Sequence, residues 1–172
     1  EGIADKLLEM LRGAAETLQV GDPALLATDL GPVIDEEARA ALAAHALRMA
    51  GEGRELIALK PGPACAQGSF FTPHAYEIDR LYRLEGEVFG PILHVIRYRP
   101  DRLDQVLEAI EATGYGLTLG IQTRIGRTAL AIHRRLGVGN TYVNRNMIGA
   151  VVGVQPFGGE GLSGTGPKAG GP

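Results

Sequence analysis

The fold of this chain is decided by residues 92–144, which read ILHVIRYRPDRLDQVLEAIEATGYGLTLGIQTRIGRTALAIHRRLGVGNTYVN. Apolar runs of strand length alternate in this stretch with segments of helical periodicity, and glycines separate several of them. The expected elements are, in order, a strand at 92–98, a helix between Asp101 and Gly114, a strand at 117–122, a helix at 128–136 and a strand at 141–144. Strands joined by helices through short connections are typical of right-handed crossovers, so the stretch predicts the α/β class with a parallel β-α-β-α-β core.

The first of these helices carries the clearest local signals. Asp101 can accept a hydrogen bond from the first turn of the helix, and Asp104 is placed to support that turn. The apolar side chains on one face are Leu103, Val106, Leu107 and Ile110. We therefore expect Asp101 to cap an amphipathic helix.

The N-terminal part of the sequence predicts two helices and one short strand. Apolar residues recur at helical spacing over residues 3–18, and an alanine-rich segment at 36–49 is followed by Gly51 and Gly53. Residues 55–59 fit a short strand. With 172 residues the chain has the length of one ordinary domain that can bury a core.

The composition excludes several classes of protein. Hydrophobic residues make up 45% and charged residues 22%, and a net charge of -3 with scattered basic residues gives no reason to expect a nucleic-acid partner. The sequence shows neither an apolar run of roughly 18 residues, as a membrane span requires, nor a secretory leader. Cys65 is the single cysteine, which fits a reducing compartment. Because helical pattern begins directly at Glu1, we expect the chain to be part of a longer protein.

Residues 145–172 break the rhythm of strands and helices. They contain nine glycines and three prolines, and a long segment of this kind is usually functional or disordered. One interpretation is a flexible linker, but apolar side chains among the glycines favour a shaped functional loop. These apolar residues are Val151, Val152, Val154 and Phe157. Small residues such as Gly149 and Ala150 let backbone N–H groups approach a bound carboxylate closely.

The segment Glu87-Val88-Phe89-Gly90-Pro91 directly precedes the first strand of the decisive stretch. Pro91 fixes its own φ and favours an extended Gly90, so the turn is stiff. Glu87 and Phe89 are two residues apart in extended chain, which places their side chains on the same side. A carboxylate can accept hydrogen bonds from a ribose diol, and a ring can pack against a nicotinamide. The alternative is a strand-entry turn with a solvated Glu87 and a core Phe89.

Three further features suggest chemistry at first sight. The segment from Gly159 to Gly164 matches G-x-G-x-x-G, but the glycines and prolines after it cannot form the helix that this fingerprint requires. Cys65 has no neighbouring histidine or helix start to activate its thiol. The histidines lack metal-ligand spacing and are interpreted as single structural or surface residues, so no metal site is expected. They are His45, His74, His94 and His133.

Four segments in a fixed order resemble the C-terminal signposts of the aldehyde dehydrogenase superfamily. They are Glu87–Pro91, Tyr115–Leu117, Gly139–Asn144 and Pro156–Gly159. Each segment is weakly specific by itself, but the ordered set is strong, and the resemblance covers essentially the whole chain. Within the superfamily, the segment from Asn144 to Pro172 is most similar to the dehydrogenase half of the bifunctional proline utilization A family, which is similar to 1-pyrroline-5-carboxylate dehydrogenases.

The resemblance implies the aldehyde dehydrogenase catalytic-domain fold and an NAD(P)-dependent enzyme that oxidises L-glutamate γ-semialdehyde to L-glutamate in proline catabolism. In this family a cysteine thiolate attacks the aldehyde, hydride passes to the nicotinamide, and water hydrolyses the thioester. By resemblance, Glu87 would hold the nicotinamide ribose and Phe89 would pack beside the nicotinamide. Backbone amides of Gly149 and Ala150 would bind the α-carboxylate of the substrate, and Phe157 would line the channel around its aliphatic part.

The resemblance also implies what lies outside this chain. The nucleophilic cysteine, the general-base glutamate and most of the cofactor domain of the family correspond to sequence upstream of Glu1, and Cys65 does not match the nucleophile. We therefore expect residues 1–172 to be a partial catalytic domain, with 145–172 as its substrate-anchor loop and glycine-rich tail. This chain is expected to be inactive by itself, with no catalytic residue of its own, and to expose apolar surface that favours self-association.

Cofactors and partners follow from the same resemblance. They comprise NAD or NADP, FAD only in a partner proline dehydrogenase domain, glutamate semialdehyde as substrate, the upstream domains of the parent chain and a homo-oligomer. The parent is expected in the cytoplasm, with peripheral membrane association possible for the family. Two alternatives stay open: a noncatalytic aldehyde-dehydrogenase-like assembly domain, and an aldehyde dehydrogenase with another substrate. The presence of Glu87, Phe89 and the Gly149-Ala150 pair favours the catalytic copy.

Overall fold

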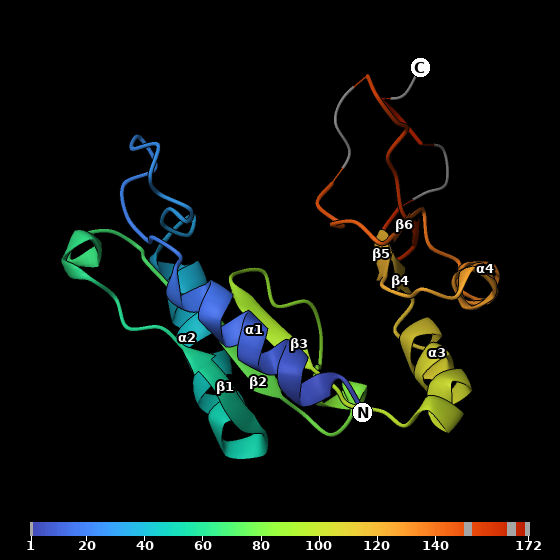
Figure 1. The fold of residues 1–172 in the computed structure, drawn as a ribbon. Coiled ribbons are helices and arrows are strands. Elements are labelled where there is room, and N and C mark those ends of the chain that lie inside the picture. Colours follow the sequence, from blue (N-terminus) through green and yellow to red (C-terminus); the bar gives the residue numbers. More distant parts are fainter. Residues whose placement is uncertain (1, 150–152, 165–167, 171–172) are drawn as a thin grey trace. The chain divides into compact units, whose positions relative to one another are not determined.

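Two compact units make up the chain, Glu1–Arg99 (unit 1) and Pro100–Pro172 (unit 2). The computed structural model describes residues 2–149, 153–164 and 168–170 (Figure 1). Within these described ranges, no helix has both the length and the apolar character needed to cross a membrane.

A three-stranded sheet with the order β1-β2-β3 forms the centre of unit 1. Strand β1 (Arg54–Ala58) pairs antiparallel with β2 (His74–Glu77), and β2 pairs parallel with β3 (Ile92–Val95). Strand β1 confirms the strand expected at 55–59. The sequence did not predict β2, because its four residues are polar at both ends and show their strand character only through their two neighbours.

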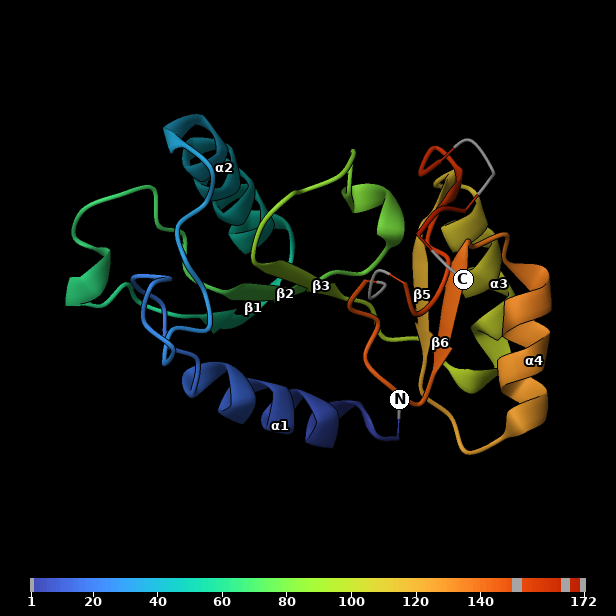
Figure 2. The ribbon, with the colours of Figure 1, turned by 90° about the horizontal axis from the view of Figure 1, so that it is seen from above.

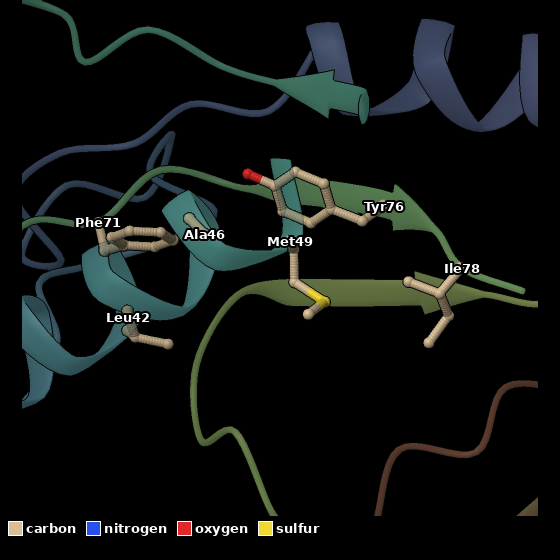
Figure 3. Packing of buried hydrophobic residues seen from close by; sticks show 6 residues of the cluster. All are labelled: Leu42, Ala46, Met49, Phe71, Tyr76 and Ile78. Atoms are coloured by element: carbon tan, nitrogen blue, oxygen red, sulfur yellow. The ribbon is translucent and has the colours of Figure 1, made fainter. Parts of the chain in front are cut away.

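Helices α1 (Ala4–Glu16) and α2 (Glu36–Glu52) lie on opposite faces of this sheet (Figure 2). Neighbouring residues Ala75 and Tyr76 of β2 enter different buried clusters, because successive side chains of a strand point to opposite faces. The cluster beneath α1 is Ala15, Leu56, Ile57 and Ala75. The cluster beneath α2, which we call the α2 core, is Leu42, Ala46, Met49, Phe71, Tyr76 and Ile78 (Figure 3).

Helix α2 begins and ends on identifiable local signals. The Asp35 carboxylate accepts a hydrogen bond from the backbone N–H of Ala38 at 2.8 Å, which satisfies one of the free donors of the first turn. The helix runs three residues beyond the expected 36–49 and ends at Gly53. A Cβ at Gly53 would lie 2.6 Å from the backbone oxygen of Glu77, so this close approach of helix end and strand requires glycine.

Unit 2 contains the crossover that the sequence predicts. Its helices and paired strands are α3 (Leu103–Glu111), β5 (Thr118–Ile121), α4 (Gly126–Arg135) and β6 (Asn140–Val143). Strands β5 and β6 pair parallel with α4 between them, which confirms this part of the expected α/β pattern. Two residues of the tail form β7 (Glu160–Gly161), which pairs antiparallel with β4 (Tyr115–Gly116).

Two expectations for residues 92–144 need correction. Strand β3 belongs to the sheet of unit 1, where its parallel partner is β2, whereas β5 and β6 form a separate pair. Asp101 is not at the cap position of α3: it lies in the 3₁₀ turn η3 (Pro100–Arg102), and the cap position falls on Arg102, which makes no side-chain cap hydrogen bond. The 3₁₀ turn moves the start of the α-helix, and with it the cap position, one residue further along the chain.

Candidate functional site

The cofactor-binding candidates Glu87 and Phe89 lie in unit 1, in the loop between the 3₁₀ helix η2 (Leu81–Arg83) and β3. Val88, between them, packs against the α2 core, whereas the Phe89 side chain is 87% exposed and Glu87 is exposed. The backbone N–H of Ile92 donates to the Gly90 oxygen at 2.8 Å and closes a tight turn around Pro91. The alternative of a core phenylalanine is therefore wrong for Phe89.

This loop has the groups that a nicotinamide nucleoside requires. Within the described residues, neither the Glu87 carboxylate nor the Phe89 ring is engaged in a hydrogen bond, ion pair or ring contact with another part of the chain. A free carboxylate offers two acceptor oxygens to a ribose diol, and a free ring offers an apolar surface to a flat heterocycle. The residues present thus fit the group that the sequence suggests.

In unit 2, Asn144 lies where β6 has ended and the glycine-rich residues 145–172 begin. Its φ is 54°, in the left-handed region that asparagine tolerates better than most residues. Its carboxamide oxygen accepts from the Thr123 N–H at 2.9 Å, and its Nδ2 donates to the Thr123 oxygen at 2.9 Å. Asn144 therefore ties the exit of β6 to the loop that follows β5.

Replacing Asn144 by alanine is expected to lower the free energy of unfolding of the complete dehydrogenase by about 1–2 kcal/mol. The change removes two solvent-exposed hydrogen bonds and places a residue with a Cβ but no compensating side chain at a left-handed φ. Thermal unfolding of Asn144→Ala, beside Asn146→Ala at an exposed position two residues later, measures the effect. Equal melting temperatures for the two variants would contradict the role given to the carboxamide.

The substrate-binding candidates Gly149 and Phe157 lie beside each other in unit 2. A Cβ at Gly149 would be 3.7 Å from Cζ of the Phe157 ring. The backbone of Phe157 exchanges two hydrogen bonds with Ala169, of 2.9 and 3.1 Å, which hold the half-buried ring in place. Ala150 lies outside the described residues. The structure thus brings two of the three candidates together, and their role in substrate binding stays a prediction.

Side chains of β6 hold the segment that carries Phe157. The Asn140 amide donates to the Pro156 oxygen at 3.0 Å, and its oxygen accepts from the Gly158 N–H at 3.3 Å. Gln155 Nε2 donates to the Tyr142 hydroxyl at 2.8 Å. The described part of the tail is therefore a shaped loop rather than a free linker.

The glycines of the G-x-G-x-x-G match serve close backbone packing. A Cβ at Gly159 would lie 2.4 Å from the Ser163 oxygen, and one at Gly164 would lie 2.4 Å from the Gly159 oxygen. The Ser163 hydroxyl accepts from the Gly116 N–H at 3.0 Å. A hollow of about 150 Å³ opens nearby, but its lining includes none of the predicted site residues. The segment is thus a tight turn around β7, in agreement with the rejection of a phosphate cradle.

Cys65 sits in a structural environment. Its half-buried thiol lies 3.6 Å from the Val20 carbonyl oxygen, to which it can act as a weak donor. In the described part of the chain, no three side chains of histidine, cysteine, aspartate or glutamate gather in a way that could hold a metal ion.

The interpretation of the histidines as single residues is wrong for two of them. His45 of α2 and His94 of β3 meet with their Nε2 atoms 2.9 Å apart and their rings edge to face. Sequence spacing does not reveal this pair, because 49 residues separate the two positions. A signal was present, since His45 follows the buried Leu42 by three residues on α2 and His94 follows Ile92 by two residues on β3.

Burial lowers the pKa of His45 below its ordinary value, the positive Arg48 lowers it further, and Glu52 acts in the opposite direction. Burial also lowers the pKa of His94, followed by the effects of His45 and Arg48. Below a pH of about 6.5 an unfolded histidine binds a proton that the folded pair resists, so folded stability is lost as the pH falls from there.

We expect the melting temperature of the complete dehydrogenase to fall more steeply between pH 7 and pH 5 than that of the variant His45→Gln/His94→Gln. The variant lacks the two groups whose proton uptake differs between the folded and unfolded states. Differential scanning fluorimetry across this range measures both slopes. Parallel curves would show that the pair does not govern the pH dependence.

Comparisons with known proteins show the family of this chain. A family profile described as "Aldehyde dehydrogenase family" matches residues 1–172. Bifunctional protein PutA of Escherichia coli is 53% identical over 175 residues, covering 99% of this chain and 13% of the relative. The 1-pyrroline-5-carboxylate dehydrogenase of Geobacillus kaustophilus is 36% identical, covering 100% of this chain and 33% of the relative.

Solved structures show the same fold. A crystal structure of a Bradyrhizobium japonicum proline utilization A mutant has a TM-score of 0.93 and 59% identity, over 99% of this chain and 17% of that one. The Thermus 1-pyrroline-5-carboxylate dehydrogenase with bound NAD has a TM-score of 0.81 and 36% identity, over 95% of this chain and 31% of that one. The chain thus spans at most about a third of these relatives. It belongs to the aldehyde dehydrogenase family.

Proposed function

We propose that the protein containing this chain is an NAD(P)-dependent dehydrogenase that oxidises L-glutamate γ-semialdehyde to L-glutamate in proline catabolism. The observation that carries the proposal is the similarity over the full chain to proteins named 1-pyrroline-5-carboxylate dehydrogenase and over 99% of it to bifunctional PutA. The groups described above support it, because the exposed loop of Glu87 and Phe89 fits a nicotinamide nucleoside.

The residues of this chain act in binding and orientation. Glu87 accepts hydrogen bonds from the nicotinamide ribose, and Phe89 packs beside the nicotinamide, which when bound accepts the hydride of the aldehyde. The backbone amides of Gly149 and Ala150 bind the α-carboxylate of the substrate, and the Phe157 ring packs against its aliphatic part. Amides that stay unpaired with an aldehyde that lacks a carboxylate would give this site its selectivity.

The wider setting is part of the same proposal. The nucleophilic cysteine and the general base belong to other segments of the parent protein, in line with the structural environment of Cys65. FAD belongs to a proline dehydrogenase domain that supplies the semialdehyde, and the parent works as a homo-oligomer in the cytoplasm.

Steady-state assays of the complete dehydrogenase test the proposal. We expect kcat/KM for glutamate semialdehyde to exceed that for an aliphatic aldehyde such as hexanal by at least about 100-fold, because only the first substrate pairs with the loop amides. Equal values for the two aldehydes would overturn the substrate assignment.

A matched pair of variants locates that selectivity. Gly149→Pro removes the backbone N–H that is proposed to bind the carboxylate, whereas Gly149→Ala keeps it, and its Cβ meets the Phe157 ring at an ordinary contact distance of 3.7 Å. We expect Gly149→Pro to raise KM for the semialdehyde with little change for hexanal, and Gly149→Ala to behave like the wild type. Equal KM values for the semialdehyde in both variants would exclude this amide as a ligand.

A further inference from the structure

The loop that carries Glu87 and Phe89 is fastened at its ends. Hydrogen bonds of the main chain flank it, from the Leu84 N–H to the Leu81 oxygen at 3.0 Å and from the Ile92 N–H to the Gly90 oxygen at 2.8 Å. Val88 packs on the α2 core. The position of the loop therefore depends on what holds its two ends against the rest of unit 1.

Helix α2 makes that connection on both sides of the loop. Before the loop, Arg48 Nη1 donates to the Arg83 backbone oxygen at 3.0 Å. After the loop, His45 meets His94 at 2.9 Å. At the loop itself, the Leu42 side chain approaches Gly90 so closely that a Cβ there would lie 2.5 Å from Leu42 Cδ1.

The three contact residues lie on one face of the helix, at positions 42, 45 and 48. Residues three apart are neighbours on a helix surface, so this face forms a continuous strip against the loop ends. This strip contacts the loop and its two ends through a methyl group of Leu42 and two hydrogen bonds, made by His45 and Arg48. The exposed side chains of Glu87 and Phe89 thus belong to a loop that the strip supports.

The Arg48 guanidinium decides which ring nitrogen of His45 carries the hydrogen. Arg48 Nη2 lies 3.4 Å from His45 Nδ1, and because a guanidinium only donates, this ring nitrogen is the acceptor. The neutral His45 then carries its hydrogen on Nε2 and donates it to His94 Nε2. The other groups that face the pair are Glu52, which pairs with Arg48 at 3.3 Å, and Tyr76, the register partner of His94 on β2.

We propose that Arg48, His45 and His94 are positioning residues that hold the Glu87–Phe89 loop in its binding conformation and thereby set the affinity for the nicotinamide cofactor. The proposal rests on the proposed role of Glu87 and Phe89. It predicts that a substitution that breaks the hydrogen bonds among Arg48, His45 and His94 weakens cofactor binding, although none of these residues contacts the cofactor.

Isothermal titration calorimetry with NAD on the complete dehydrogenase tests the positioning role of these three residues. His94→Leu removes the acceptor of the His45 hydrogen, and we expect the Kd for NAD to rise about 5- to 30-fold, which is the scale of losing a partly buried hydrogen bond. His94→Gln keeps an acceptor oxygen and is expected to restore most of the affinity. His133→Leu, at an exposed histidine of unit 2, is the control and should leave the Kd unchanged.

The pH dependence separates positioning from a general loss of structure. Protonation of the pair converts acceptor nitrogens to donors, so the Kd of the wild type should rise as the pH falls through the lowered pKa values of the folded pair, and that of His94→Gln should rise less. A melting temperature of His94→Leu close to that of His94→Gln, together with a different Kd, supports the proposal. Equal Kd values for these two variants, or equal pH slopes for the wild type and His94→Gln, would overturn it.

A second pair of variants tests the apolar contact at the same loop. Gly90→Ala places a Cβ 2.5 Å from Cδ1 of the buried Leu42, so the loop or the Leu42 side chain must shift, whereas a Cβ at Gly86 meets no atom within 4 Å. We expect only Gly90→Ala to raise the Kd for NAD, and the double variant Gly90→Ala/Leu42→Val to recover part of the affinity. Equal Kd values for the two alanine variants would count against the strip as a support of the loop.

Failure of this inference differs from failure of the proposed function. If Glu87→Ala weakens NAD binding and His94→Leu does not, the cofactor role of the loop stands and the positioning role is wrong. If Glu87→Ala leaves the Kd for NAD unchanged, the cofactor assignment itself is wrong, and the positioning inference falls with it.

Discussion

Gly139→Ala is expected to destabilise the complete dehydrogenase by about 3 kcal/mol or more, the upper range for overpacking. A Cβ at this position would lie 1.7 Å from the Gly158 backbone oxygen and 2.8 Å from its carbonyl carbon. Backbone atoms cannot rotate out of the way as a side chain can. One of the two chain segments must therefore move.

Movement is costly here because hydrogen bonds hold the two segments in place. The Gly139 N–H donates to the Gly116 oxygen at 3.0 Å, and Asn140 bonds to both Pro156 and Gly158. Displacing Gly158 also displaces Phe157, the ring beside Gly149. We therefore expect kcat/KM for glutamate semialdehyde to fall together with stability.

Gly137→Ala provides the matched control two residues earlier. A Cβ at Gly137 meets no atom within 4 Å, so the same substitution adds a methyl group in open space. Thermal unfolding should place Gly139→Ala several degrees below Gly137→Ala. Coincident melting curves and equal kcat/KM values would refute the account of this close approach.

Elements with a strong local pattern were predictable from the sequence. The apolar spacing of α1 and the alanine-rich segment of α2 fix these helices to within a few residues, and the crossover from β5 through α4 to β6 follows from alternating strand and helix patterns. Local propensity and burial agree in these segments, and such agreement makes sequence patterns informative.

Features that depend on distant partners were not predictable. Strand β2 becomes a strand by pairing with β1 and β3, and the partner of β3 is set by chain packing rather than by its own residues. The same holds for His45 and His94, whose contact joins a helix to a strand 49 residues away. Asp101 shows that local patterns also have a limited precision, because one 3₁₀ turn moves the cap position of α3 from Asp101 to Arg102.

The candidate site also contains parts that local sequence predicts and parts that depend on distant residues. The two-residue period of extended chain predicts that Glu87 and Phe89 share one side, but spacing alone left a core Phe89 open, and only the structure shows that both side chains are exposed. The contact between Gly149 and Phe157 depends on hydrogen bonds from β6 and from Ala169, and sequence spacing does not reveal these. The resemblance to a family supplied their pairing before the geometry did.

Glu87→Ala is expected to raise the Kd of the complete dehydrogenase for NAD by about 10- to 100-fold, the scale of losing hydrogen bonds to a charged acceptor. The side chain is exposed, so its truncation should leave the melting temperature nearly unchanged. This combination of weak binding and normal stability is opposite to the result expected for a packing defect.

Glu85→Ala is the control for net charge, because Glu85 is an exposed carboxylate in the same loop, two residues earlier. If Glu87 acted on the cofactor only through its charge, both variants would change the Kd for NAD alike, and since NAD is itself anionic, removing either charge would tighten binding. A directed contact to the ribose predicts instead that Glu87→Ala weakens binding while Glu85→Ala changes it less than about twofold. Calorimetric titration of both variants with NAD therefore decides between a hydrogen bond from the ribose to Glu87 and an effect of the net charge of the loop. Equal Kd values would exclude the hydrogen bond.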